Sequence, residues 1–239
     1  MGHGGGPEPA HAAFQTSTIT ALLDGAYDGD VSVGELRRHG DLGLGTFNAL
    51  DGEMVALDGE FWRADADGAL HRAGDELLVP FAAVTMFTAD ETVAIDAPLG
   101  LSGLVDSIRA RLPRSGCAAL RLDGTFARVH ARSVPRQLPP YRPLAEVAEE
   151  QHEFDLADFE GSLVGFVFPH EAAALNVPGH HLHVASADRR AGGHVLAVDV
   201  ERGTLMLDRL DDLHLELPPG VDLPHGPVDR ATLGRIEGG

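Results

Sequence analysis

Three Asp-Gly steps, at residues 51–52, 58–59 and 67–68, punctuate the stretch "DGEMVALDGEFWRADADG". The segments between them are short runs of apolar or alternating residues. An Asp-Gly pair between such runs is a strong signal for a two-residue hairpin turn, because both residues tolerate the backbone conformations that the turn needs. Residues 41–90 are therefore predicted to form a meander of strands joined by tight turns.

Strand and helix patterns both occur in the remainder of the chain. A short helix is expected after the capping candidates at residues 16–18, with Ile19, Leu22 and Leu23 at helical spacing. Another is expected after Ser32, which has a glutamate three residues on and a glycine stop at Gly40. A further helix is expected over residues 101–112, with Leu104, Ile108 and Leu112 on one face, and another in "LAEVAEEQHEFDL". Strands are expected over 117–134 and in the segments "GSLVGFVFP", "HHLHVAS", "GGHVLAVDV", "GTLMLDRL" and "LHLELP".

These patterns predict an α+β fold with two β-sheet halves, mixed or mostly antiparallel, and a few helices. We expect a flexible tail over residues 1–13, which contains His3 and His11 and receives no role. An N-terminal β-rich subdomain is expected over 14–120 and a C-terminal metal-binding subdomain over 121–239. The metal site is predicted to lie on adjacent strands of the C-terminal half.

Composition excludes several function classes. The formal net charge is −19, which disfavours nucleic acid and anionic membrane surfaces as partners. All 18 basic residues are arginine, so no side chain can form a Schiff base with a carbonyl substrate or pyridoxal phosphate. The single cysteine, Cys117, excludes internal disulfides and fits a reducing compartment. We therefore expect a cytoplasmic protein, without a secretory signal or a membrane-spanning run.

Four histidines gather in "GHHLHVASADRRAGGH". In a strand, residues two apart share a face, so His181 and His183 project together while His180 shares the face of Leu182. The Gly-Gly segment lets the chain return, and His194 can then join the pair from the next strand. Three imidazoles with open positions suit a catalytic Zn²⁺. The plain alternative is a hairpin with surface or core-rim histidines, and a cupin is a competitor that also uses HxH on a strand.

Several blocks spread over residues 14–215 carry a family resemblance. They include "TSTITALLDGAYDGDVSVGEL", "HGDLGLGTFNALDGEMVALDGEF", "ARSVPRQLPPYRPL", "EGSLVGFVFP" and "NVPGHHLHVASADRRAGGHVLAVDV". In this order they resemble the α-acetolactate decarboxylase family. The resemblance implies a carboxy-lyase that converts 2-acetolactate to (R)-acetoin and CO₂ with Zn²⁺ and no organic cofactor. It also implies a homodimer, and the ligands His181, His183 and His194.

The resemblance extends to other site residues. It implies that Arg132, in "ARSVP", is a catalytic and substrate-binding arginine, and that Glu53, in "LDGEM", is a catalytic acid or proton relay. Thr46 is implied as a substrate contact and Glu237 as a catalytic glutamate from the C-terminal end. His180 stands where the family usually has an aromatic residue, so we expect it to be a core-rim side chain. Without the resemblance, Arg132 would suggest a surface ion pair and Glu53 a solvated turn residue.

The lysine-free composition bears on the mechanism. Loss of CO₂ from a β-keto acid leaves an enediolate, and with no lysine for an imine a Lewis acid is the natural electron sink. Our hypothesis is a metal-bound enediolate, with Arg132 orienting the leaving carboxylate and Glu53, together with Glu237, completing protonation. Two alternatives stay open: a non-catalytic metal- or ligand-binding relative, and a zinc hydratase or hydrolase.

Overall fold

A computed structural model describes residues 11–221 as two large β-sheets, a small two-stranded sheet and a few short helices. The strands are β1 (Ala12–Thr16), β2 (Val31–Ser32), β3 (Leu42–Thr46), β4 (Glu53–Leu57), β5 (Glu60–Ala64), β6 (Leu70–Arg72), β7 (Leu78–Val79), β8 (Phe81–Thr85), β9 (Glu91–Ile95), β10 (Leu99–Gly100), β11 (Cys117–Ser133), β12 (His152–Phe168), β13 (Gly179–Ser186), β14 (Gly192–Leu210) and β15 (Asp212–Glu216). The helices are α1 (Ile19–Leu23), α2 (Val33–His39), α3 (Leu101–Arg109) and α4 (Leu144–Val147), with 3-10 turns η1 (Asn48–Leu50), η2 (Ala148–Glu150) and η3 (His170–Ala172). This arrangement confirms the expected α+β class with few helices.

The first sheet contains the predicted meander. Its strand order is β15-β1-β8-β3-β4-β5-β6, antiparallel throughout except for the parallel pair β1–β15. Asp58 and Gly59 join β4 to β5 with φ values of 55° and 73°, the left-handed conformations that a tight hairpin turn requires. The Asp-Gly signal at residues 58–59 therefore marks a hairpin turn, as predicted.

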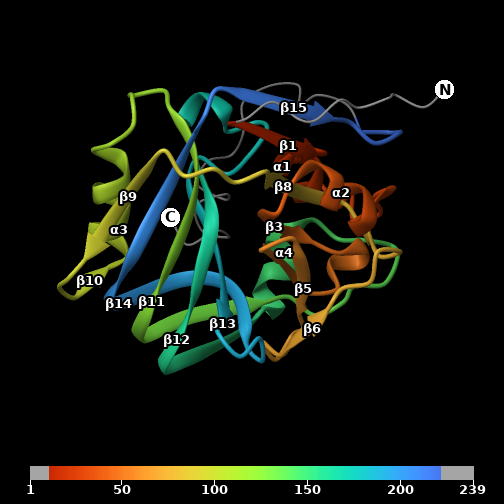
Figure 1. Cartoon of the computed structure of the whole chain (residues 1–239). Coiled ribbons are helices and arrows are strands. Elements are labelled where there is room, and N and C mark those ends of the chain that lie inside the picture. The colour runs from red at the N-terminus through yellow and green to blue at the C-terminus, as the bar shows by residue number, and fades with distance from the viewer. Residues whose placement is uncertain (1–10, 222–239) are drawn as a thin grey trace.

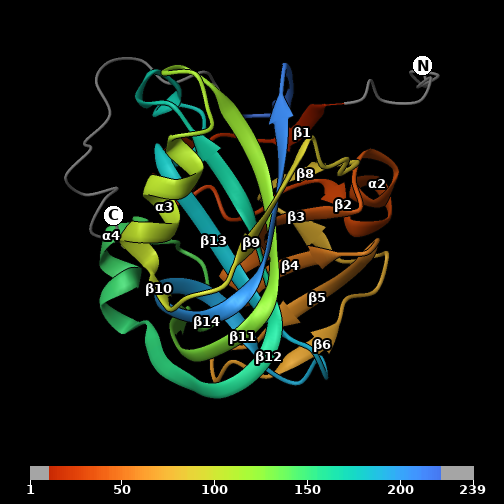
Figure 2. The same cartoon turned by 60° about the vertical axis from the view of Figure 1, so that its left-hand side comes forward.

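The second sheet is built from long, curved strands that close on themselves. Its order is β10-β14-β11-β12-β13, and β13 pairs in turn with the start of β14. The four strands β14, β11, β12 and β13 thus form a ring around an apolar core (Figure 1). Helix α3 packs its buried Leu104 and Ile108 against this core, on the face that its sequence period predicted (Figure 2).

The two sheets pack face to face. Strands β3 and β4 of the first sheet contact β12, and β4 also contacts β13 and β14 of the second. A core cluster drawn from both sheets, including Leu44 and Val55 on one side and Val164 and Phe166 on the other, fills the interface. This packing matters for function, because it brings β4 of the meander onto β13 and β14, the strands that carry the histidine cluster.

The helix starts follow their local signals. Thr18 caps α1 by accepting a hydrogen bond from the backbone N–H of Ala21, and Ser32 caps α2 by accepting one from Glu35. Helix α2 ends at Gly40, as predicted. No helix within residues 11–221 is both long and apolar enough to span a membrane.

Other expectations need correction. The helix predicted in "LAEVAEEQHEFDL" ends after one turn of α4 and η2, and β12 begins at His152. Residues 152–156 instead pair with β11, from Ser133↔His152 to Val129↔Leu156. Pairing along a seventeen-residue partner strand overrides a weak local helical period. The segments "GGHVLAVDV" and "GTLMLDRL" are not separate strands either, since both belong to β14.

The described structure departs in three places from the expected tail and subdomain boundaries. Ala12 and Ala13, which we assigned to a flexible tail, are buried in β1; residues 1–10 lie outside the described part. The strands change from the first sheet to the second between β8 and β9, which pairs with β14, so the change comes ahead of residue 120. Strand β15 then returns to the first sheet beside β1, where the C-terminal blue meets the N-terminal red (Figure 1).

Candidate metal centre and active site

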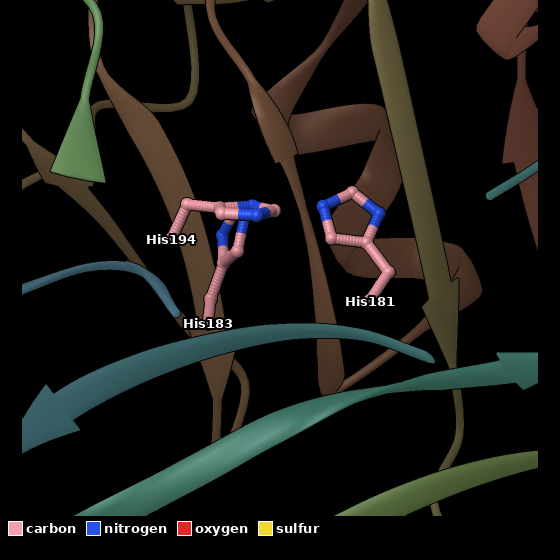
Figure 3. A group of neighbouring side chains, drawn as sticks. All are labelled: His181, His183 and His194. Atoms are coloured by element: carbon pink, nitrogen blue, oxygen red, sulfur yellow. The ribbon is translucent and has the colours of Figure 1, made fainter. Parts of the chain in front are cut away.

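The three histidines of the predicted metal site project from two paired strands. His181 and His183 lie two residues apart on β13, and His194 on β14 is the direct cross-strand partner of His183. All three are buried, with exposed fractions of 6%, 0% and 1%. Figure 3 shows the rings of His183 and His194 on one side and the ring of His181 turned towards them from the other. His181 and His183 share a face because side chains alternate along β13, and the chain returns in β14 to bring His194 beside them.

The spacing of the three rings fits a single ion. One ligand nitrogen from each histidine lies within 4.8 Å of the other two. Nδ1 of His194 is 3.3 Å from Nε2 of His183. The ring centroids are separated by 5.0–5.3 Å. Two nitrogens at about 2.0–2.1 Å from one divalent metal lie no more than about 4.2 Å apart, and the 3.3 Å pair of His183 and His194 meets this limit.

His183 is held in the tautomer that a metal ligand needs. Its Nδ1–H donates a hydrogen bond of 2.7 Å to the backbone carbonyl of Met54, so its Nε2 faces the other two rings. Burial lowers the pKa of His183 to about 3, against the hydrogen bond to Met54 and with help from the charge of Arg132. Burial also holds the pKa of His181 well below its usual value. Neutral imidazoles are the ligand form, so the donor set fits a metal.

A buried ion pair lies next to the histidines. Arg132, on β11, is the cross-strand partner of His194, and its Nη1 donates a hydrogen bond of 3.0 Å to Oε1 of Glu53. The other oxygen of Glu53 lies 3.6 Å from Nε2 of His183. Arg132 and Glu53 are only 4% and 7% exposed. Burial raises the pKa of the Glu53 carboxyl, and the positive charge of Arg132 opposes that rise. Neither residue has the surface setting that its sequence context alone suggests.

The remaining predicted site residues fall into three situations. Thr46, at the end of β3, pairs with Glu53, and both line a cavity together with Arg132, His181 and His194. The hydroxyl of Thr46 donates a hydrogen bond of 2.8 Å to the carbonyl of Gly52. His180 lies partly buried outside the three-histidine group, and burial lowers its pKa with a contribution from Arg109. Its Nε2 atom has no hydrogen-bond partner among the described residues. Glu237 lies outside the described residues.

Sequence reasoning missed two components of the site. The first is the Met54 carbonyl, a backbone group that no side-chain motif can reveal. The second is the apolar part of the cavity lining, whose residues belong to one core cluster. The cavity lines its polar side with Thr46, Glu53, Arg132, His181 and His194, and its apolar side with Ile19, Leu22, Leu50, Phe81, Val134 and Leu144. The apolar residues come from segments far apart in the chain, so only the helix face of α1 had a local signal.

Comparison with known proteins agrees with this geometry. A family model described as alpha-acetolactate decarboxylase matches residues 13–224. The alpha-acetolactate decarboxylase of Methanosarcina mazei is 44% identical over 210 residues, which cover 87% of this chain and 73% of the relative. That of Klebsiella aerogenes is 41% identical over 211 residues, or 88% and 81% of the two chains.

The fold comparison points the same way. The X-ray structure of alpha-acetolactate decarboxylase from Bacillus subtilis strain 168 matches with a TM-score of 0.91 and 36% sequence identity, covering 95% of this chain and 100% of that one. The resemblance read from the sequence blocks is thus confirmed over most of the chain. The chain belongs to the alpha-acetolactate decarboxylase family, a family of carboxy-lyases.

Proposed function

We propose that this protein decarboxylates 2-acetolactate to acetoin and CO₂ in the cavity beside the three histidines, with zinc as its metal. The observation that carries the proposal is the buried pair of Arg132 and Glu53 within reach of the histidine group. Family membership supplies the substrate, through the names of the relatives. The same family membership argues against a cupin, which was the competing interpretation of the HxH motif.

His181, His183 and His194 would hold the metal. When bound there, a divalent ion supplies Lewis-acid chemistry, which polarises a ketone oxygen and stabilises the negative charge that builds as CO₂ leaves. Three neutral nitrogen donors with open positions favour zinc. The protein contributes the tautomer of His183, through Met54, and a site from which water is largely excluded.

Arg132 would receive the carboxylate of the substrate. A guanidinium presents several N–H donors in one plane and can bind a carboxylate through two of them. Glu53 already engages Nη1, which restricts the orientation of the group. Arg132 would thereby fix the direction of the carboxylate, which is the group that leaves as CO₂.

Glu53 would deliver the proton that replaces CO₂. The reaction consumes one proton at the carbon that loses the carboxylate, so a protonated acid is needed nearby. Burial raises the pKa of Glu53 and so increases the protonated fraction near neutral pH. The hydroxyl of Thr46 would contact the substrate. Participation of Glu237 and the (R) configuration of the product stay predictions from the family resemblance, as do the homodimer and the cytoplasmic location.

One experiment tests the proposal directly. Purified protein is assayed for acetoin from racemic 2-acetolactate, its zinc is measured by elemental analysis, and the assay is repeated after chelation and after zinc is restored. We expect about one zinc per chain, loss of turnover on chelation and recovery with zinc. Full turnover in zinc-free protein would end the metal part of the proposal. Stoichiometric zinc with no acetoin would instead support a non-catalytic metal-binding relative, and turnover of esters or CO₂ with no acetoin would support a hydrolase or hydratase.

A further inference from the structure

The candidate cavity is lined by polar and by apolar side chains, and the proposed reaction uses only the polar ones. The apolar side consists of Ile19, Leu22, Leu50, Phe81, Val134 and Leu144, here called the apolar wall. All six belong to one core cluster and are at most 6% exposed. A buried surface of aliphatic side chains and one phenylalanine, in a cavity that is also lined by Arg132, His181 and His194, favours the hydrocarbon part of a ligand.

The apolar wall comes mainly from short elements rather than from the long strands. Ile19 and Leu22 lie on the five-residue α1, Leu144 begins the four-residue α4, and Leu50 ends η1. The polar side, by contrast, is fixed by the paired strands β3, β4, β11, β13 and β14. The wall can therefore vary in shape without disturbing the histidines or the Arg132–Glu53 pair.

The cavity is small. The space open to the centres of water molecules is about 30 Å³, and roughly 10–15 Å³ of such space is enough to hold one water molecule. A substrate with two methyl groups must already displace wall side chains to enter. Each further methylene on the substrate requires more room from the same side chains, because closely packed interiors have little slack.

We propose that the apolar wall binds the alkyl groups of the substrate and limits their size, with Leu144 as the main size-determining residue. The inference rests on the proposed function, since it names which part of a 2-hydroxy-3-oxo acid meets which side of the cavity. Of the six residues, Leu144 is the most suitable for changing the size of the cavity. It begins the single-turn helix α4, so a shorter side chain at this position leaves every paired strand intact.

The test compares substrates that differ by one methylene. Wild type and Leu144→Ala are assayed with 2-acetolactate and with its homologue that carries an ethyl group in place of the methyl on C2. One methylene in an apolar pocket changes kcat/KM by roughly 10- to 200-fold. We expect the ratio of kcat/KM for the ethyl over the methyl substrate to rise at least about 10-fold in Leu144→Ala. Val134→Leu, which narrows the cavity, should lower the ratio.

The matched control is Val147→Ala. Val147 lies on the same short helix and in the same cluster and is fully buried, but it does not line the cavity. It should loosen α4 to a similar degree and leave the substrate ratio unchanged. An equal shift in Val147→Ala would overturn the proposal, because general loosening would then explain the effect. Leu144→Val, a smaller change, replaces Leu144→Ala if the latter does not fold.

A binding measurement separates this proposal from the proposed function. Calorimetry with unreactive 2-hydroxy-2-methyl carboxylates of increasing alkyl length should show affinity falling with length in wild type and falling less in Leu144→Ala. If wild type makes no acetoin but shows this pattern, the proposed reaction fails and the size limit stands. If both proteins show the same length dependence in binding and in turnover, the apolar wall does not select the alkyl group.

Discussion

At the scale of single residues, burial gives ordinary side chains their special properties. A histidine in water titrates near pH 6.5, but His183 is fully buried and its pKa falls to about 3. Such a ring stays neutral through the physiological range and keeps a lone pair for a metal. The same burial raises the pKa of Glu53, whose carboxyl would be an unremarkable acid on a surface turn.

His183→Ala should abolish both zinc content and acetoin formation. The variant removes the imidazole that the Met54 carbonyl orients, and the two remaining imidazoles are too few for a stable catalytic metal site. Zinc per chain and turnover are measured on the same sample. His180→Phe is the matched control: His180 is a near neighbour on β13 outside the three-histidine group, so this variant should keep both. Retained zinc in His183→Ala would exclude it as a ligand.

Arg132→Ala should keep zinc, lose turnover and change how stability depends on pH. Arg132 is the charge that holds down the pKa of buried Glu53, so its removal raises that pKa further above the unfolded value. A carboxyl with a raised folded pKa binds more protons in the folded than in the unfolded state. Stability must then fall as pH rises from about 4.5 towards the folded pKa. Breaking a buried ion pair costs about 3–5 kcal/mol when the other charge stays ionised.

Urea unfolding of Arg132→Ala from pH 5 to pH 8 measures this dependence. The double variant Arg132→Ala/Glu53→Gln is the control, because a neutral amide at position 53 should remove the slope assigned to Glu53. An identical pH slope in the single and double variants would show that Glu53 is not its source. Normal acetoin formation by Arg132→Ala would remove Arg132 from the reaction.

At the scale of elements, the site depends on close approach between strands. Gly165 on β12 is the register partner of Leu182 on β13. A Cβ atom at Gly165 would lie 2.1 Å from the carbonyl oxygen of His181, and backbone cannot move aside as a flexible side chain can. The sequence "GSLVGFVFP" predicted a strand here, but not why its central residue is glycine.

Gly165→Ala should therefore weaken zinc binding as well as stability. Separating β12 from β13 shifts the backbone that carries His181, and overpacking of this kind typically costs about 1–3 kcal/mol. The measurements are the midpoint of urea unfolding and the zinc dissociation constant. Gly100→Ala is the matched control, since a Cβ there would meet nothing nearer than 3.8 Å. Equal zinc affinity in the two variants would contradict a role for this strand contact.

At the scale of the whole molecule, His11 links the two sheets. It directly precedes β1 of the first sheet, and its Nδ1 hydrogen-bonds over 2.6 Å to the carboxylate of Asp208 on β14 of the second sheet. Its Nε2 lies 3.8 Å from the carboxylate of Asp90. Asp208 is fully buried, so its charge needs a partner. We had placed His11 in a tail without a role, because a histidine in a Gly/Pro-rich stretch carries no local sign of a distant carboxylate.

The contribution of His11 to the free energy of unfolding should consequently decrease from near-neutral to alkaline pH. The hydrogen bond to Asp208 raises the pKa of His11 against the effect of burial, and the charges of Asp208 and Asp90 add to the rise. A raised histidine pKa stabilises the fold fully below the unfolded value of 6.5 and loses that contribution as pH passes the folded value. His11→Gln, neutral at every pH, should be less stable than wild type at pH 6, and the difference should shrink towards pH 9. A constant difference would argue against the charge.

The sequence by itself determined the parts that depend on local periodicity and turn chemistry. These are the hairpin at Asp58–Gly59, the caps at Thr18 and Ser32, the α3 face and the shared face of His181 and His183. Only the tertiary structure decided the rest: the pairing of residues 152–156 with β11, the return of β15 to β1, the tautomer of His183 and the apolar wall. The physical reason is range. Periodicity and turns act between residues a few positions apart. Sheet register and carbonyl–imidazole contacts join more distant groups, such as Ser133 and His152 on paired strands, or Met54 and His183, which are more than a hundred residues apart.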